Sequence, residues 1–572
     1  MNAARTYLVC FLIIIICNAN AQKAINASFI NAYNYSSQKT ITCSNGAVVS
    51  AHPLASQAGL SVLKKGGNAI DAAIATQLAL AVVYPGAGNL GGGGFMIAKL
   101  QNGKNIALDY REKAPAAAGR DMYLDKEGNP QMELSQNGHL ASGVPGTVAG
   151  LFASLTYAKL PFALLIEPAI VLAEKGFAIS ESEAASLNEG KGEFMKYNTM
   201  QPVFIKETLW KAGDTLVQKD LANTLKRIRD LGQKGFYEGE TARLIIEEMK
   251  RGKGLITYND LKNYQAKERT ALIFPYKGYT IVTMPLPSSG GIIINQTMKM
   301  IEDKNIAKMG FQSLAAVHLM VEAERRAYAD RAIFMGDVDF VKVPVKKLTS
   351  DAYIRGRMSD FDPNKAGSSE TIKEGDIKHE SEETTHLSII DKYGNAVSVT
   401  TTLNNHYGGK TVVGGAGFLL NDEMDDFSVK PGVPNMYGAI GAEANAIAPG
   451  KRMLSSMTPA IVLKNNKPFI VLGTPGGTTI PTSVYQTLVN MLEFNLSTAD
   501  AVYKPKFHHQ WKPDEIYAEK GFPDSLVEEL KAMGYKVTIR GRIGRTEVIK
   551  VLPNKKFEAV ADNRGEDSAE GF

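Results

Sequence analysis

The sequence predicts an α+β fold in which two β-sheets pack face to face and helices cover the outer sides. Segment 68–83 is almost wholly apolar, so a helix formed there has to be buried on every side. Residues 384–572 are rich in short alternating segments, which are typical of strands with one buried face. Because strands and apolar helices occur in both halves of the chain, we expect a sheet-against-sheet core between helical layers.

The bulk composition is that of a globular protein. Charged residues make up 22% and hydrophobic residues 44% of the 572 residues, enough for one large core or two closely joined ones. The formal net charge of +5 is small for this length, and no basic tract stands out. We therefore expect no nucleic acid partner.

The N-terminus has the pattern of a secretory signal peptide. Arg5 precedes an apolar run over 7–17, and an Ala-x-Ala sequence ends at Ala21. The run is too short for a comfortable membrane span, and no later segment is long and apolar enough for one. We expect residues 1–21 to be removed and no stable membrane span to remain.

Cysteine usage fits export without internal disulfides. Cys10 and Cys17 lie inside the predicted signal peptide, so only Cys43 stays in the mature chain. A lipidated Cys17 is disfavoured because the bulky Ile16 precedes it. Without a disulfide pair, an exported protein needs a large self-sufficient core. The bacterial periplasm is the expected compartment.

Hydrophobic periodicity and helix stop signals place the secondary structure along the chain. In the first half we expect a polar tether over 22–50, strands at 47–49, 95–100 and 106–112, and helices at 53–65, 68–83, 146–159, 165–175, 219–231, 239–250 and 312–333. A polar linker, 361–383, closes this half. In the second half we expect helices at 481–493 and 524–533, and strands at 386–390, 396–402, 411–420, 459–464, 468–473, 537–540 and 546–551.

A glycine-rich segment at 86–96 invites comparison with nucleotide-binding loops. The dinucleotide fingerprint requires a strand, then the glycines, then a helix. Here the glycines follow a predicted helix and lead into a predicted strand, which is the reverse order. We interpret this segment as a tight turn in which two backbones approach closely.

The join at Glu383 and Thr384 is the most unusual local feature. A charged run over 373–383 stops at two threonines, and an alternating hairpin pattern begins directly after them. One interpretation is a strand start, where threonine is favoured. The other is a scissile Glu383–Thr384 bond, whose cleavage makes Thr384 a new N-terminus and a nucleophile.

Four further motifs in the second half each have a structural and a chemical interpretation. The structural interpretations are a solvated acidic loop, a capped turn, a proline-glycine turn and a strand with adjacent histidines whose rings point apart. These motifs are 421–428, 454–459, 473–478 and 507–511. The adjacent histidines lack a nearby third ligand, so we expect no metal and no cofactor.

Taken together, the motifs fit the head group of an amino acid. Glu423 and Asp426 would hold an α-ammonium group. Arg111 ends an apolar strand, and with the hydroxyls of Ser455 and Ser456 it would hold an α-carboxylate, the guanidinium group bidentately.

The same set of motifs is also compatible with an acyl-transfer reaction. Gly476 and Gly477 could offer adjacent backbone N–H groups to an oxyanion. The missing parts are a nucleophile and a base, and a threonine with a free α-amine supplies both.

These motifs resemble, in order, those of the γ-glutamyltranspeptidase family of secreted bacterial N-terminal nucleophile hydrolases. The resemblance extends over nearly the whole mature chain. It rests on segments 66–73, 89–96, 109–112, 286–291, 384–386, 421–428, 454–457 and 473–477.

The resemblance implies an αββα sandwich and self-cleavage between Glu383 and Thr384. The products would be a large subunit, 22–383, and a small subunit, 384–572, which stay together as a heterodimer. Thr384 would attack the γ-carbonyl of glutathione or a related γ-glutamyl compound. Water would accept the acyl group in hydrolysis, and an amino acid or dipeptide would accept it in transpeptidation.

The resemblance also assigns roles to residues around Thr384. Its own α-amine would act as the base and Thr402 would orient its hydroxyl. The remaining assignments are Gly476 and Gly477 for the oxyanion, Arg111, Ser455 and Ser456 for the α-carboxylate, and Asn404, Glu423 and Asp426 for the α-amino group. A lid over 431–442 would latch through Tyr437 against Asn404.

Small departures from the family pattern concern the surroundings of the site. Asn405 and Gly409 replace residue types that are usual there, Asp422 adds a negative charge near the ammonium site, and His406 is unusual. Two alternatives keep the fold: an acylase of the cephalosporin acylase type and a non-catalytic periplasmic binding protein. Retention of Arg111, Ser455 and Ser456 disfavours the first, and retention of Thr384, Thr402, Gly476 and Gly477 disfavours the second.

Overall fold

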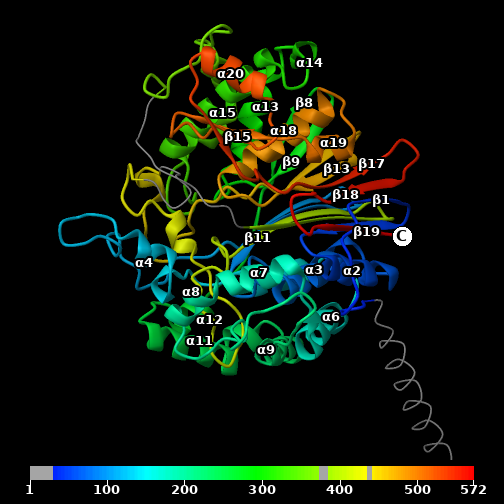
Figure 1. Ribbon diagram of the computed structural model, residues 1–572, viewed down its shortest axis with the longest axis vertical. Helices are drawn as coiled ribbons and strands as arrows, with labels where there is room; N and C mark the ends of the chain where they lie inside the picture. Colours follow the sequence, from blue (N-terminus) through cyan, green and yellow to red (C-terminus); the bar gives the residue numbers. More distant parts are fainter. Residues whose placement is uncertain (1–29, 373–383, 434–440) are drawn as a thin grey trace, which may run out of the picture.

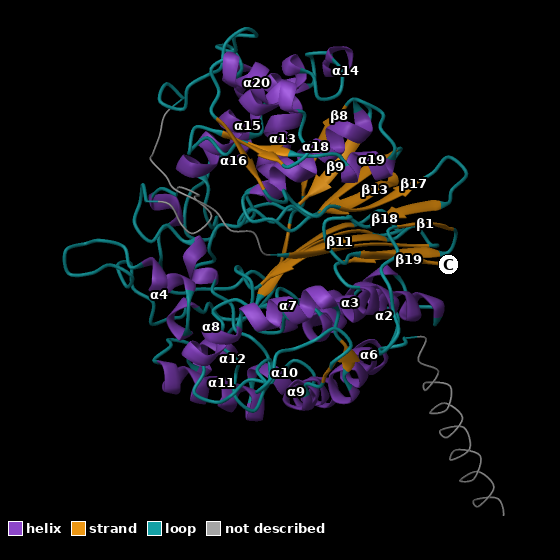
Figure 2. Cartoon of the chain, in the orientation of Figure 1, coloured by secondary structure: helices purple, strands orange, loops and turns teal. Residues whose placement is uncertain are grey.

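A computed structural model describes residues 30–372, 384–433 and 441–572 (Figure 1). The predicted signal peptide, Glu383 and Tyr437 lie outside the described residues. Two β-sheets lie against each other in the middle of the molecule, and helices cover both outer faces (Figure 2). The predicted αββα arrangement is therefore confirmed.

Each main sheet has seven strands, and all neighbouring strands are antiparallel. The first sheet has the order β1 (Thr40–Cys43), β18 (Phe557–Val560), β17 (Glu547–Val551), β13 (Lys467–Gly473), β12 (Ala460–Lys464), β9 (Tyr279–Thr283) and β8 (Leu272–Tyr276). The second has the order β19 (Ser568–Gly571), β2 (Gly46–Ser50), β10 (Thr385–Asp391), β11 (Ala396–Thr402), β3 (Gly93–Lys99), β4 (Asn105–Asp109) and β7 (Lys267–Arg269).

Two smaller sheets lie outside the sandwich. One contains β14 (Phe507–His508), β15 (Ile516–Glu519) and β16 (Val537–Arg540), and the other contains β5 (Phe177–Ala178) and β6 (Thr215–Leu216).

The helices on the side of the second sheet come from the first half of the chain (Figure 1). They are α2 (Pro53–Lys64), α3 (Ala69–Val83), α4 (Met132–Gln136), α5 (Thr147–Leu155), α6 (Phe162–Lys175), α7 (Glu181–Glu189), α8 (Lys191–Tyr197), α9 (Lys219–Leu231), α10 (Lys234–Tyr237), α11 (Gly239–Gly252) and α12 (Tyr258–Lys262). Every residue of α3 is buried, as its apolar sequence requires, and an Asn68–Asp71 capping box begins it.

The helices on the side of the first sheet come from both halves. They are α13 (Gly290–Ile301), α14 (Ile306–Met309), α15 (Leu314–Phe334), α16 (Val345–Leu348), α17 (Asp351–Arg357), α18 (Thr479–Leu492), α19 (Thr498–Tyr503) and α20 (Asp524–Ala532). Three single-turn 3₁₀ helices complete the described elements: η1 (His139–Ala141), η2 (Glu423–Asp426) and η3 (Glu443–Asn445).

The interface between the two sheets is an apolar cluster formed by both of them. Phe95, Ile97 and Ile390 from the second sheet pack with Ile461 and Val471 from the first. Separate apolar clusters join each sheet to its own helical layer. This packing fixes the position of β13 over β10, which matters for the site.

Both sheets mix segments from the two sides of the predicted scissile bond. β10 pairs with β2 on one side and β11 pairs with β3 on the other, so strands following residue 384 lie between strands that precede 383. A cut at this bond would leave these ladders intact, because strand pairing does not depend on chain continuity at 383–384.

The prediction of a strand at 411–420 is wrong. Only isolated bridges occur there, Val412 with Leu419 and Gly91 with Leu420. Gly415 and Gly417 have φ angles of 74° and 79°, which turn the chain back on itself and prevent an extended strand.

The described part of the predicted polar linker lies against the protein. Ser369 is buried, and its backbone N–H donates to Asp514 at 2.7 Å. The carbonyl of Ile372 accepts a hydrogen bond from the Trp511 indole. The rest of the linker, 373–383, falls outside the described residues. Within the described ranges, no helix combines the length and apolarity needed to cross a bilayer.

Candidate active site

Thr384 immediately precedes β10, and only 5% of its surface is exposed. Thr385 pairs with Thr401 across the β10–β11 hairpin, so the next pair along these antiparallel strands sets Thr384 opposite Thr402. Both Thr384 and Thr402 line the same cavity. Strand register therefore brings the predicted nucleophile and its predicted orienting hydroxyl into one site.

Gly476 and Gly477 form the turn between β13 and α18. Their φ angles are 134° and 52°, conformations that favour glycine. A side chain on Gly476 would also collide with Thr479, because an added Cβ would lie 2.5 Å from its Oγ1. The turn leads into the N-terminus of α18, where backbone N–H groups lack helical acceptors and partial positive charge accumulates. Such a turn can stabilise an oxyanion.

Arg111 follows β4, and its guanidinium group is almost fully buried. Its Nη1 lies 2.5 Å from Oε2 of Glu423, and its Nη2 donates to Asp426. The sequence prediction assigned Arg111 to a carboxylate and the two acids to an ammonium group. The structure brings all three into direct contact, so the buried guanidinium group lies against both carboxyl groups.

Burial shifts the acidic groups of this cluster toward their protonated forms. It raises the pKa of Glu423 well above the usual value and also raises the pKa of Asp426, while Arg111 opposes both shifts. Burial likewise raises the pKa of Glu112 to about 7 and the pKa of Asp422 to about 8. Near neutral pH the cluster therefore carries less negative charge than the same carboxyl groups would carry in water.

Ser455 is held in place by the backbone of the turn before α13. Its N–H donates to the Pro287 carbonyl at 2.9 Å, and its carbonyl accepts from the Ser289 N–H at 2.7 Å. Asn404 is anchored from the other side, because its Nδ2 donates to the Asp422 carbonyl at 3.0 Å. Both Ser455 and Asn404 reach the cavity at Thr384.

This cavity, called here the head-group cavity, unites most of the predicted site. Its lining is Arg111, Arg331, Thr384, Thr402, Asn404, Glu423, Asp426, Ser455, Ser456, Met457, Gly477, Thr478 and Ile480. Predicted residues Glu383 and Tyr437 lie outside the described residues, and Gly476 lines the neighbouring cavity instead.

Arg331 was missed by sequence reasoning. It lies on α15, is 7% exposed, and its Nη2 donates to the Ser456 hydroxyl at 3.3 Å. A signal was available, because the charged residues over 322–331 fall on more than one face of this helix. A helix with charges on several faces in the middle of a chain has to bury some of them.

Comparison with known proteins identifies the family. The family model described as Gamma-glutamyltranspeptidase matches residues 55–572. The chain belongs to this family. It is 46% identical over 531 residues to the glutathione hydrolase proenzyme of Escherichia coli K12, covering 92% of each chain.

Solved structures agree with the γ-glutamyltranspeptidase assignment. The Helicobacter pylori γ-glutamyltranspeptidase structure is 46% identical, with a TM-score of 0.56, and the match covers 59% of this chain and 96% of that one. A cephalosporin acylase from Bacillus halodurans matches with a TM-score of 0.81 at 25% identity, covering 94% and 98% of the two chains. The stacked antiparallel sheets are thus the family fold.

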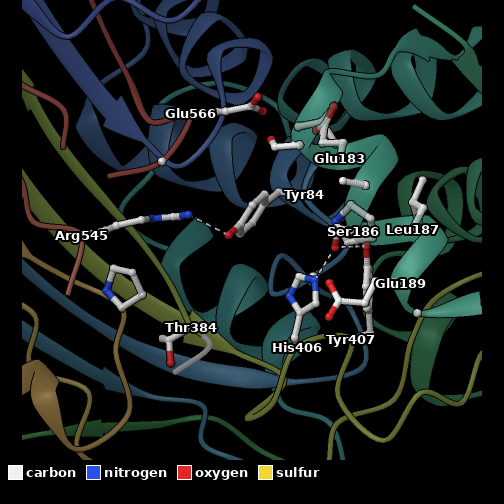
Figure 3. Close-up of a pocket in the computed structure, with 18 of the residues that line it drawn as sticks. Tyr84, Glu183, Ser186, Leu187, Glu189, Thr384, His406, Tyr407, Arg545 and Glu566 are labelled. Carbon is white, nitrogen blue, oxygen red and sulfur yellow. Dashed lines mark hydrogen bonds between the residues drawn. The ribbon is translucent and has the colours of Figure 1, made fainter. Parts of the chain in front are cut away.

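Thr384 also lines a second, larger cavity in this member of the γ-glutamyltranspeptidase family (Figure 3). Gly476, Arg545 and His406 contribute to its lining. Arg545 donates to the Tyr84 hydroxyl at 3.0 Å. The His406 Nε2 lies 2.7 Å from the hydroxyl of Ser186, which gives this unusual histidine a structural partner.

One group of possible metal ligands occurs among the described residues: His52, Glu183 and Glu566. The His52 Nδ1 accepts a hydrogen bond from the Leu54 N–H at 3.2 Å, which places the ring proton on Nε2. That Nε2 lies 3.1 Å from Glu183. A nitrogen that carries the ring proton cannot bind a metal ion, so this group fits a close contact between His52 and Glu183 instead of a metal site.

Proposed function

We propose that this chain is a precursor that cuts itself between Glu383 and Thr384 and then hydrolyses or transfers γ-glutamyl groups, as expected of a glutathione hydrolase. The observation that carries the proposal is the position of Thr384. It immediately precedes a buried strand, lies opposite Thr402, and adjoins both the Gly476–Gly477 turn and a cavity suited to an amino acid head group.

Cleavage would produce a large subunit, 22–383, and a small subunit, 384–572. The Thr384 hydroxyl attacks the preceding carbonyl, the amide becomes an ester, and water releases the Glu383 carboxylate. The subunits would remain a heterodimer, because β10 and β11 are hydrogen-bonded to β2 and β3 on either side.

The freed α-amine of Thr384 then acts as the base for its own hydroxyl. Oγ1 attacks the γ-carbonyl, and the backbone N–H groups of Gly476 and Gly477 stabilise the oxyanion. The ammonium group returns the proton to the departing amine, which leaves a γ-glutamyl ester on Thr384. Water releases glutamate from this ester, or the amine of an amino acid or dipeptide takes over the acyl group.

Recognition of the substrate would centre on the head-group cavity. Arg111, with Ser455 and Ser456, binds the α-carboxylate, and the amide of Asn404 with the two acids Glu423 and Asp426 binds the α-amino group. For this the Arg111 ion pairs have to open and admit the ligand charges in their place. Tyr437, in the predicted lid, would close over Asn404.

We further propose that the protein is exported, with removal of residues 1–21, and acts in the bacterial periplasm. The support is the N-terminal sequence pattern alone. N-terminal sequencing of the protein recovered from the periplasm of an expressing cell tests it, and a large subunit that begins at Met1 would refute it.

One preparation tests the catalytic proposal. Denaturing electrophoresis should resolve two fragments of the sizes expected for a cut at 383–384, and the native protein should release 4-nitroaniline from γ-glutamyl-4-nitroanilide. A single unsplit band without anilide turnover would refute the proposal. Turnover of a cephalosporin side-chain amide with no γ-glutamyl turnover would instead favour an acylase.

A further inference from the structure

The head-group cavity contains two arginines, and they are used differently. Arg111 is in contact with both Glu423 and Asp426. Arg331 has no carboxylate within 4.0 Å among the residues that the structure describes, and Asp426 acts on it only at longer range. A buried guanidinium group without an anion is costly, so a site that keeps one usually provides it for a ligand anion.

The hydrogen bonds of Arg331 hold it in this position. Its Nε donates to the Ser289 hydroxyl at 3.2 Å, and Ser289 in turn donates to the Ser455 carbonyl at 2.8 Å. Its Nη2 donates to the Ser456 hydroxyl at 3.3 Å. The guanidinium group is therefore built into the same framework that presents Ser455 and Ser456 to the cavity.

The contact with Ser456 has a chemical consequence. A serine oxygen that accepts from Arg331 keeps its own O–H free to donate elsewhere. Ser456 also lines the head-group cavity. An anion bound there would meet both the Ser456 O–H and the positive charge of Arg331.

We propose that Arg331 is the second cation of the α-carboxylate site and makes the enzyme select acyl groups that carry an α-carboxylate. This inference rests on the proposed γ-glutamyl function. Arg111 is in contact with the acids that receive the ammonium group, whereas Arg331 contacts only serine hydroxyls among the described residues and can serve the ligand carboxylate. Arg331 acts directly on the carboxylate and also by positioning the Ser456 hydroxyl.

The test compares two substrates that differ only in the α-carboxylate, γ-glutamyl-4-nitroanilide and 4-aminobutanoyl-4-nitroanilide. In Arg331→Gln, kcat/KM for the first should fall on the order of 100-fold, mainly through KM, while kcat/KM for the second changes less than about threefold. Arg331→Lys should retain part of the selectivity, because it keeps the charge but loses the fork of donors. Equal losses on both substrates, or no loss on either, would overturn the inference.

If the Arg331→Gln precursor is not cleaved into its two subunits, a matched pair of serine variants tests the role of Arg331. Ser289→Ala removes the hydroxyl that anchors Arg331 and should lower the selectivity ratio several-fold. Ser288→Ala removes the neighbouring hydroxyl, which donates to the Met457 carbonyl at 2.6 Å and does not touch Arg331, and should leave the ratio unchanged. Equal ratios in the two variants would overturn the inference.

The wild-type enzyme separates this inference from the proposed function. Absence of γ-glutamyl anilide turnover by the split wild-type protein refutes the function itself. Normal wild-type turnover with an unchanged selectivity ratio in every Arg331 and Ser289 variant refutes only the role of Arg331.

Discussion

The two cavities that meet at Thr384 differ in size and in how their charges are arranged. The head-group cavity has a volume of about 20 Å³, and its acids lie in contact with Arg111. The larger cavity has a volume of about 1000 Å³ and is lined by acids and bases from several elements (Figure 3). Among them, Arg545 lies against Asp567 and Tyr84.

This difference teaches where recognition is concentrated. A volume of about 20 Å³ holds roughly one water molecule, so side chains that line this cavity, among them Arg111 and its acidic partners, have to move before an acyl group can fit. Each ligand charge that replaces a side-chain charge in this cavity should therefore affect the binding affinity. In the larger cavity a ligand can be accommodated without such exchange, so single side chains should matter less. The following variants test this contrast.

The largest effect is expected at the residue the cavities share. On the proposed mechanism Thr384→Ala removes both the group that cuts the precursor and the nucleophile, so splitting should stop and turnover should fall at least about 10⁴-fold. Denaturing electrophoresis and the anilide assay measure the two effects. Thr384→Ser keeps a hydroxyl and should still split, whereas a split Thr384→Ala protein would move the scissile bond elsewhere.

Arg111 should show the next largest effect. Arg111→Lys loses the bidentate contact, so KM for the γ-glutamyl anilide should rise about 10- to 100-fold with a smaller change in kcat. Arg111→Gln leaves Glu423 and Asp426 buried without this cation and should cost about 3 kcal/mol of unfolding free energy.

The control for Arg111 is a partly exposed arginine with an acidic partner. Arg120 pairs with Glu443 at 2.9 Å on the surface, and Arg120→Gln should change neither KM nor the unfolding midpoint appreciably. An unchanged KM in Arg111→Lys would remove Arg111 from the carboxylate site.

Asp422 gives a prediction about pH. Its pKa is raised to about 8, mainly by burial, so the folded protein holds a proton that the unfolded chain releases near pH 4. Stability from this group is therefore complete below about pH 4 and is lost as pH rises toward 8. Relative to Asp422→Asn, the wild-type unfolding midpoint should fall between pH 4 and pH 8 and then level off. Parallel curves for the two proteins would show that Asp422 does not titrate in this way.

Much of the fold and of the site could be predicted because the decisive signals are local. The alternation after Thr384 predicts the β10–β11 hairpin, and the wholly apolar segment at 68–83 predicts a fully buried helix. The order of strands in each sheet could not be predicted, since it depends on long-range packing. The prediction of a strand at 411–420 was wrong because glycines in this segment adopt positive φ angles, which an apolar sequence pattern does not reveal.

The site shows the same division. Motifs identify Arg111 and Glu423 separately, but only the folded chain shows that they touch. Arg331 lies 125 positions from Ser456 in the sequence, and no local pattern connects the two. Family resemblance supplied the scissile bond and the role of Thr384, which the residues alone left open between two interpretations.

The smallest effect is expected at His406, in the larger cavity. Its Nε2 lies beside the Ser186 hydroxyl and its ring centroid lies 4.1 Å from that of Tyr407, so its contacts belong to the wall of the larger cavity. His406→Asn should therefore change kcat/KM for γ-glutamyl anilide hydrolysis by less than about threefold, because we propose that the acyl group binds in the other cavity. Ser186→Ala removes the hydroxyl beside His406 and should likewise change kcat/KM by less than about threefold. A loss above tenfold in a normally split His406→Asn enzyme would mean that the larger cavity also binds the acyl donor, and the contrast between the two cavities would fail.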